Sequence, residues 1–301
     1  MSSQMHDQDE FALSSLEVAR SFDRAARSYD AAAVLQARVR DELLSRLEMV
    51  RLEPSLVIDL GCGTGAAEHS LRRRYRRSRV FSVDLSLAML READRRRRPW
   101  RRFAGVCADA IRLPFADTST DLVFSNLMLQ WCADPQAVFR ECSRVLRPGG
   151  LLTFTSFGPD TLKELRSAWA AADGYTHVNR FIDMHDLGDA MLRAGLAEPV
   201  MDAELYTLTY PDVGGLMRDL KAIGAHNVNA GRARGLTGRR ALERMTAAYE
   251  GERRDERLPA TYEVVYGQAW AAVGGHRSSA PAGETRIPIG QIGRRGSRSQ
   301  G

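Results

Sequence analysis

The chain has 301 residues, of which 44% are hydrophobic and 27% are charged, and its formal net charge is +5 at pH 7. This composition is ordinary for a globular protein with a hydrophobic core, and it excludes a fibrous or low-complexity chain. No apolar run approaches the roughly 20 residues that a membrane span needs, and the first ten residues contain no apolar signal core. We therefore expect a cytoplasmic protein that does not enter a membrane.

The cysteines and the basic residues predict neither a metal site nor a nucleic-acid site. No two of the four cysteines form a C-x-x-C pair, and none has a histidine at a metal-ligand spacing. Arginines cluster at 72–77 and 95–98, where we expect helices to end. Because arginine complements the carboxyl end of a helix dipole, we interpret the clusters as solvated helix ends. An acidic protein partner is the alternative interpretation, ahead of nucleic acid.

The first half of the chain predicts a helical segment followed by alternating strands and helices. Apolar residues recur at near-helical spacing within 11–50, and Pro54 then separates this segment from the first strand. The predicted strands are 56–60, 80–84, 103–107, 122–125 and 151–157, with helices near 65–77, 86–97 and 135–146 between them. This alternation is typical of a parallel sheet with helices on both faces.

The second half of the chain alternates less regularly. We predict helices at 159–173 and 183–193, and strands at 200–210 and 262–266. The long segment before the last strand is a natural place for a cover over a substrate. The expected organisation is a polar segment 1–20, one domain over 21–272 with lid insertions near 159–181 and 211–258, and a Gly/Arg/Ser-rich, partly disordered tail over 273–301.

A glycine-rich loop follows the first predicted strand. Gly61, Gly63 and Gly65 allow the backbone to turn sharply and to approach a ligand, and the next helix offers free N–H groups. The spacing to Ala66 also satisfies the dinucleotide fingerprint G-x-G-x-x-A, with Asp84 about 20 residues further on. The loop alone therefore leaves open a nicotinamide enzyme and an S-adenosylmethionine enzyme.

Acidic residues at successive strand ends favour S-adenosylmethionine. Asp59 lies inside the first strand, where its carboxylate can face an ammonium group, which NAD lacks. Asp84 ends the second strand, and Asp109 follows the third, where it suits the exocyclic amine of adenine. Because ligands of open α/β sheets bind outside the carboxyl ends of the strands, these side chains converge on one edge.

This pattern resembles the class I S-adenosylmethionine methyltransferases. The resemblance implies a doubly wound, Rossmann-like α/β fold with a mostly parallel seven-stranded sheet whose last strand is antiparallel. It also implies that Asp59 meets the methionine moiety, Asp84 the ribose hydroxyls and Asp109 the adenine. The cofactor-binding residues predicted on this basis are Asp59, Gly61, Cys62, Gly63, Gly65, Asp84, Leu85, Asp109, Ala110, Ser125 and Asn126.

Four further stretches resemble a narrower family. They are 22–30 (FDRAARSYD), 126–132 (NLMLQWC), 177–181 (HVNRF) and 220–227 (LKAIGAHN), the last continuing to Arg232. Together they resemble the malonyl-[acyl-carrier-protein] O-methyltransferases of biotin synthesis, over roughly residues 20 to 270. The stretch 220–227 is the most specific, because other methyltransferases lack it.

This narrower resemblance implies methyl transfer from S-adenosylmethionine to the free carboxylate of a malonyl thioester, on acyl carrier protein or coenzyme A, by a monomer. A carboxyl group with a pKa of about 4 is already ionised at pH 7, so no catalytic acid or base is expected. One arginine contact is expected to orient the carboxylate. The substrate-binding candidates are Tyr29, Gln130, Arg180, Lys221, His226, Asn227 and Arg232.

Other functions remain open from the sequence. An S-adenosylmethionine-binding assembly factor of respiratory complex I shares the N-terminal stretch and residues 126–131, although the stretch 221–232 argues against this alternative. A small-molecule methyltransferase, for example of quinones, and a non-enzymatic binding module are the remaining alternatives.

Overall fold

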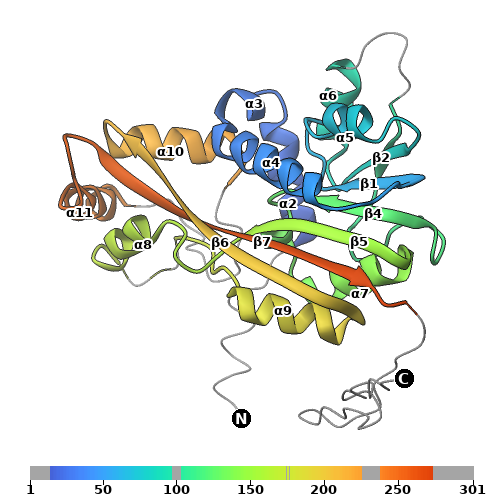
Figure 1. Ribbon diagram of the computed structural model, residues 1–301. Helices are drawn as coiled ribbons and strands as arrows, with labels where there is room; N and C mark the ends of the chain where they lie inside the picture. Colours follow the sequence, from blue (N-terminus) through green and yellow to red (C-terminus); the bar gives the residue numbers. More distant parts are fainter. Residues whose placement is uncertain (1–13, 97–102, 174, 176, 226–237, 274–301) are drawn as a thin grey trace, which may run out of the picture.

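A seven-stranded sheet with the order β3-β2-β1-β4-β5-β7-β6 forms the centre of the protein in the computed structural model (Figure 1). The structure describes residues 14–96, 103–173, 175, 177–225 and 238–273. The strands are β1 Leu56–Leu60, β2 Arg79–Asp84, β3 Gly105–Cys107, β4 Thr120–Ser125, β5 Leu146–Phe157, β6 Leu196–Tyr210 and β7 Leu258–Ala271. Strands β1 to β5 are parallel, and β7 runs antiparallel to both β5 and β6. The predicted fold class is confirmed.

Helices cover both faces of this sheet (Figure 1). They are α2 Ser15–Ala25, α3 Tyr29–Ala32, α4 Val34–Arg46, α5 Glu68–Arg74, α6 Leu87–Arg96, α7 Pro135–Val145, α8 Lys163–Ala170, α9 Met184–Arg193, α10 Val213–Ala222 and α11 Arg239–Glu250. Alternate residues of a strand point to opposite faces, so Val57 packs with α4 and α5 while Ile58 packs with α7 and α9. Both side chains are fully buried, as central strands of a parallel sheet require.

Helix α7 has the boundaries that its sequence predicts. The Asp134 carboxylate accepts a hydrogen bond from the Ala137 amide at 2.9 Å, and Pro135 occupies the first turn. The helix ends at Val145, and Gly149 adopts a φ of +77°. Residues 147–150, which lie between the predicted helix 135–146 and the predicted strand 151–157, already belong to the long strand β5.

The arginine clusters lie largely at helix ends. Arg72 in the last turn of α5 pairs with Glu68, and Arg96 in the last turn of α6 pairs with Glu92. These i,i+4 pairs support the interpretation as solvated helix ends. Within the ranges given above, no helix is both long and apolar enough to cross a membrane.

Helix α2 begins inside the segment that the sequence assigns to a polar N-terminus. Val18 and Ser21 form a buried face on α2, and the Ser21 hydroxyl donates to the Gly224 carbonyl at 3.0 Å. The Ser28 hydroxyl reaches the Ala222 carbonyl at 3.1 Å. The distinctive stretch at the end of α10 therefore packs on the N-terminal helices.

The predicted lid segments contain α8, α10 and α11, which Figure 1 shows grouped near one end of β6 and β7. The Arg244 guanidinium on α11 donates to the Ala172 carbonyl after α8, with its shorter bond at 2.6 Å. The middle of the second lid segment, 226–237, and the tail 274–301 lie outside the described residues.

Replacing Gly224 with alanine should destabilise the protein by roughly 1–2 kcal/mol, because an L-residue pays this cost in the left-handed region. Gly224 has a φ of +73°, and an added Cβ would lie 3.2 Å from the Ala25 Cβ. Chemical denaturation measures the effect. Gly238→Ala is the matched control, since φ there is −62° and a Cβ would meet open space. Equal destabilisation by both substitutions would contradict the packing of α10 on α2.

Candidate functional site

Two cavities flank the glycine-rich loop at the carboxyl ends of β1, β2 and β4. The first, here called the strand-end cavity, has a volume of about 170 Å³ and includes Asp84 and Asp109 in its wall. The second, the loop cavity, has a volume of about 200 Å³ and includes Asp59. Both are lined by Tyr29, Gly61, Gly63 and Asn126. The arrangement therefore suits one elongated ligand that passes over the loop.

The loop itself requires glycine. Gly61 has a φ of +73°, and a Cβ at this position would lie 2.2 Å from Cγ of Met128. Its amide donates to the Val83 carbonyl at 2.8 Å, which fixes the turn against β2. Gly63 has a φ of +53°, and no atom lies within 4 Å of a Cβ built there. The backbone of Gly63 is therefore open to a ligand.

Asp84 holds the loop and faces the strand-end cavity. Its Oδ2 accepts from the Gly63 amide and its Oδ1 from the Ser86 amide, both at 2.8 Å. Burial raises the pKa of this carboxyl to about 6, although the two amide bonds oppose the shift. Since each carboxylate oxygen has a further lone pair, Asp84 can also accept from a pair of ligand hydroxyls.

Asp59 is a buried acid with an unsatisfied oxygen. Its side chain is 2% exposed, and its Oδ2 has no hydrogen-bond partner within the described part of the chain. Burial, together with the charges of Asp84 and Glu68, raises its pKa to about 8. Such an oxygen is costly without a partner, so it fits a ligand that brings a cation into the loop cavity.

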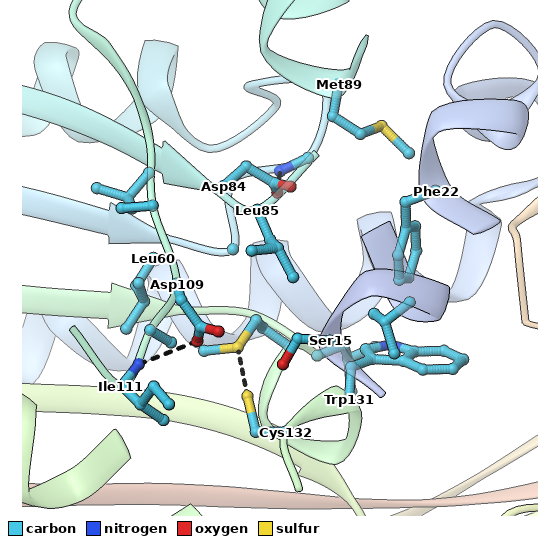
Figure 2. A pocket seen from close by; sticks show the side chains of 18 of the residues that line it. Ser15, Phe22, Leu60, Asp84, Leu85, Met89, Asp109, Ile111, Trp131 and Cys132 are labelled. Carbon is cyan, nitrogen blue, oxygen red and sulfur yellow. Dashed lines mark hydrogen bonds between the residues drawn. The ribbon is translucent and has the colours of Figure 1, made fainter. Parts of the chain in front are cut away.

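Asp109 gives the strand-end cavity a polar edge between apolar walls. Figure 2 shows its carboxylate beside Leu60 and Ile111, with Phe22 and Trp131 on the far side. Its Oδ1 accepts from the Ile111 amide at 3.2 Å. The predicted residues Leu85 and Ala110 also line this cavity. A flat ring with an amino group matches this surface.

Two predicted cofactor residues line neither cavity. The Ser125 hydroxyl donates to the Leu60 carbonyl at 2.8 Å and joins β4 to β1 instead. Gly65 supplies only backbone shape, with a φ of +76°. Cys62 does line the loop cavity, where burial raises the pKa of its thiol. Asn126 lies between the cavities, and its Nδ2 donates to the Gln36 carbonyl at 3.1 Å.

Helices α2 and α3 cover the site. Tyr29 lines both cavities, and the Phe22 ring packs edge-on against Trp131 at 5.2 Å between centroids. Asp23 ties α2 to the start of α6, since its Oδ1 accepts from the Ser86 hydroxyl at 2.6 Å. Burial, followed by the charge of Asp84, raises the pKa of the Tyr29 phenol, so this hydroxyl stays neutral at physiological pH.

Arg40 is a site residue that the sequence did not indicate as one. It lines the loop cavity together with Asp59 and Gln36. Its guanidinium donates a hydrogen bond to the Asp41 carboxylate at 2.7 Å. The positive charge of Arg40 also opposes part of the rise in the pKa of Asp59. The spacing of Gln36 and Arg40 is the available signal, because residues four apart share one face of a helix.

A third cavity, here called the arginine cavity, adjoins the strand-end cavity. It has a volume of about 490 Å³, and Cys132 and Ala133 line both. The structure brings the predicted residues Gln130 and Arg180 together in its wall, with Arg166, which the sequence did not indicate. Lys221 is exposed on α10 and lines none of these three cavities. The remaining predicted substrate residues, His226, Asn227 and Arg232, lie outside the described residues.

The strand order and the acids at the ends of β1, β2 and β3 define a class I S-adenosylmethionine-dependent methyltransferase. Residues 58–154 match the family model described as a methyltransferase domain. The YcgJ protein of Bacillus subtilis has a similar structure, with a TM-score of 0.57 at 14% identity over 79% of this chain and 99% of that one. The [4+2]-cyclase SpnF also has a similar structure, with a TM-score of 0.50 at 22% identity over 79% of this chain and 82% of that one. Because one of these folds houses a cyclase, the fold alone does not fix the reaction.

Sequence relatives identify the family. A protein of Methylovorus sp. strain MP688 is 53% identical over 268 residues, covering 87% of this chain and 90% of the relative. A relative from Laribacter hongkongensis is 55% identical, covering 84% of this chain and 88% of the relative. One from Halorhodospira halophila is 52% identical, covering 92% of this chain and 95% of the relative. All three are named malonyl-[acyl-carrier protein] O-methyltransferase. This chain belongs to the malonyl-[acyl-carrier protein] O-methyltransferase family, as its sequence predicts.

The raised pKa of Asp59 should make the ligand-free protein less stable as the pH rises from about 4 to about 8. In this window the folded state keeps a proton that the unfolded state has released, so stability falls by at most about 1.4 kcal/mol per pH unit for one retained proton. Denaturation between pH 5 and pH 8.5 measures the slope. Asp59→Asn should flatten it, and an unchanged slope in this variant would show that Asp59 ionises normally.

Proposed function

We propose that this chain transfers the methyl group of S-adenosylmethionine to the free carboxylate of a malonyl thioester carried on acyl carrier protein. The observation that carries the proposal is identity of 52–55% to relatives of that name over 84–92% of the chain. These alignments extend well beyond the 58–154 methyltransferase domain. They therefore include most of the sequence outside the cofactor loop, where substrate specificity resides.

The three acids at the strand ends fit the groups of the cofactor. Asp59 would pair its unsatisfied oxygen with the ammonium group, and Arg40 would face the adjoining carboxylate of the methionine moiety. Asp84 would accept from the ribose hydroxyls, and Asp109 from the adenine amine. Bound S-adenosylmethionine would supply an electrophilic methyl group on a sulfonium sulfur.

The chemistry needs no general base. A malonyl carboxylate has a pKa of about 4, so it is ionised at pH 7 and attacks without losing a proton. Its oxygen forms a bond to the methyl carbon while the carbon–sulfur bond breaks, and that electron pair stays on sulfur. The products are a methyl ester and S-adenosylhomocysteine, and no proton moves.

The contribution of the protein is alignment and removal of water. Phe22 and Trp131 cover the strand-end cavity on the side away from Asp109 (Figure 2), and Tyr29 also lines it. Positioning of two reactants can supply roughly 7–11 kcal/mol of a barrier in favourable cases. Tyr29 is neutral and lines both cofactor cavities, so it suits packing and orientation at the methyl group more than proton transfer.

A substrate panel tests this function. With methyl-labelled S-adenosylmethionine, the enzyme should convert malonyl-acyl carrier protein to its methyl ester, seen by mass spectrometry of the intact carrier. Acetyl-acyl carrier protein is the matched control and should stay unlabelled, because it has no free carboxylate. Malonyl-coenzyme A and a malonate monoester define how much of the carrier is required.

The outcome that contradicts the proposal is specific. If the protein binds S-adenosylhomocysteine but methylates no malonyl thioester, its assignment to the methyltransferase class would stand and its assignment to this substrate would be wrong. Restoration of growth without biotin, in a strain that lacks this step, gives an independent measure in cells.

A further inference from the structure

The arginine cavity is lined by a different set of residues from those assigned to the cofactor, and its wall mixes apolar and polar side chains. Toward the cofactor it is bounded by Cys132 and Ala133, which also line the strand-end cavity. The apolar part of its wall includes Phe181 and the buried side chains of Leu129 and Leu187. Arg166 and Arg180, both exposed residues, provide its positive charge. Because these two remain in contact with water, we assign them to the mouth of the cavity.

Arg166 is held in place without an ionic partner. Its Nη2 donates to the carbonyls of Pro159 at 2.9 Å and Thr161 at 2.7 Å. None of the ion pairs found among the described residues includes it, and partial burial lowers its pKa. Its other donors remain for a second acceptor, and a guanidinium fork suits the oxygens of a phosphate.

Gln130, in the wall of the same cavity, carries an unsatisfied acceptor. Its Nε2 donates to the Leu127 carbonyl at 2.6 Å, which fixes the orientation of the amide. Its Oε1 is buried and has no partner among the residues that the structure describes. A buried acceptor needs a donor, and a carboxylate has none to offer. A ligand with an N–H or O–H donor near Gln130 would satisfy this oxygen.

The wall of the arginine cavity also contains two acids, Asp183 and Asp186. Asp183 caps α9, and its Oδ1 accepts from the amide and the imidazole of His185 at 2.8 Å and 2.7 Å. Asp186, in the first turn of α9, is exposed. The carboxylate of Asp183 is therefore engaged locally, whereas Asp186 is as exposed as the two arginines and makes part of the wall negatively charged.

We propose that the arginine cavity binds the phosphopantetheine arm of the carrier, with Arg166 and Arg180 on its phosphate and Gln130 accepting from one of its amide N–H groups. An arm with apolar stretches, amides and a phosphate matches a wall that combines apolar side chains, an amide acceptor and two exposed guanidinium groups, and that adjoins the strand-end cavity at Cys132. This inference rests on the proposed function and deepens it. It moves Arg180 from the predicted role of orienting the reacting carboxylate, because that carboxylate must be stripped of water whereas Arg180 is exposed.

Two substrates that differ only in the phosphate provide the test. They are malonyl-4′-phosphopantetheine and malonyl-pantetheine, each assayed for methyl-ester formation. In the wild-type enzyme the phosphate should raise kcat/KM by about tenfold, mainly through a lower KM, since charge-assisted hydrogen bonds exceed neutral ones in strength. Arg166→Gln and Arg180→Gln should each lose most of this preference. Their loss of kcat/KM for malonyl-pantetheine should be much smaller than for the phosphorylated substrate, and their affinity for S-adenosylhomocysteine should change little.

Two further variants separate binding from folding. Arg193→Gln, on the exposed side of α9, removes an arginine of similar setting and should keep the full phosphate preference. Arg166→Lys keeps the cation without the fork that holds Pro159 and Thr161, and should retain a measurable part of the preference. Equal loss in the lysine and glutamine variants would assign the effect to those carbonyl bonds and overturn the proposal.

The possible failures are distinguishable. A wild-type enzyme that methylates both substrates equally would overturn the role of the arginine cavity and leave the proposed function standing. Arginine variants that lower kcat/KM equally for both substrates would instead assign Arg166 or Arg180 to orientation of the reacting carboxylate. An enzyme that methylates neither substrate, nor malonyl-acyl carrier protein, would instead remove the proposed function.

Discussion

The site depends on one constraint, which is that the carboxyl ends of parallel strands meet at one edge and here bring buried carboxylates with them. Both carboxylate oxygens of Asp84 accept hydrogen bonds from backbone amides, one in the glycine loop and one at the start of α6. In Asp59, by contrast, one oxygen is buried without a hydrogen-bond partner among the described residues. Because burial and the charge of Asp84 both raise the pKa of Asp59, a cationic ligand beside Asp59 would favour its ionised form.

The cover over this edge joins two parts of the chain that are distant in sequence. Helix α2 packs over the strand-end cavity on one side and receives the end of α10 on the other, through Ser21 and Gly224. The described part of the stretch that suggested the substrate, residues 220–225, therefore packs against a helix that lines the strand-end cavity. A change in the position of α10 has a direct route to Phe22, which lies one residue from Ser21 in the wall of the cavity.

The sequence predicts the sheet and the three acids because both follow from local rules. Strand ends can be located from apolar runs, and parallel strands bring Asp59, Asp84 and Asp109 to one edge whatever the helices do. Arg40 and Arg166 could not be found in this way, since each lies on a helix whose position relative to the edge depends on tertiary packing. Ser125 is predicted from its place at the end of β4, yet it lines neither cofactor cavity. Its hydroxyl donates to the Leu60 carbonyl instead, and strand position alone does not reveal such a contact.

The most direct test of this account is the affinity of two ligands, S-adenosylhomocysteine and 5′-methylthioadenosine, for the wild-type protein and for Asp59→Asn, measured by titration calorimetry. Both ligands carry the adenosine, but only the first has the ammonium group that Asp59 would meet. The account predicts that the substitution weakens S-adenosylhomocysteine by about tenfold or more, equivalent to about 1.4 kcal/mol, and leaves 5′-methylthioadenosine unchanged or tighter. Equal loss for both ligands, or no loss for either, would contradict the assignment of Asp59 to the cofactor's ammonium group.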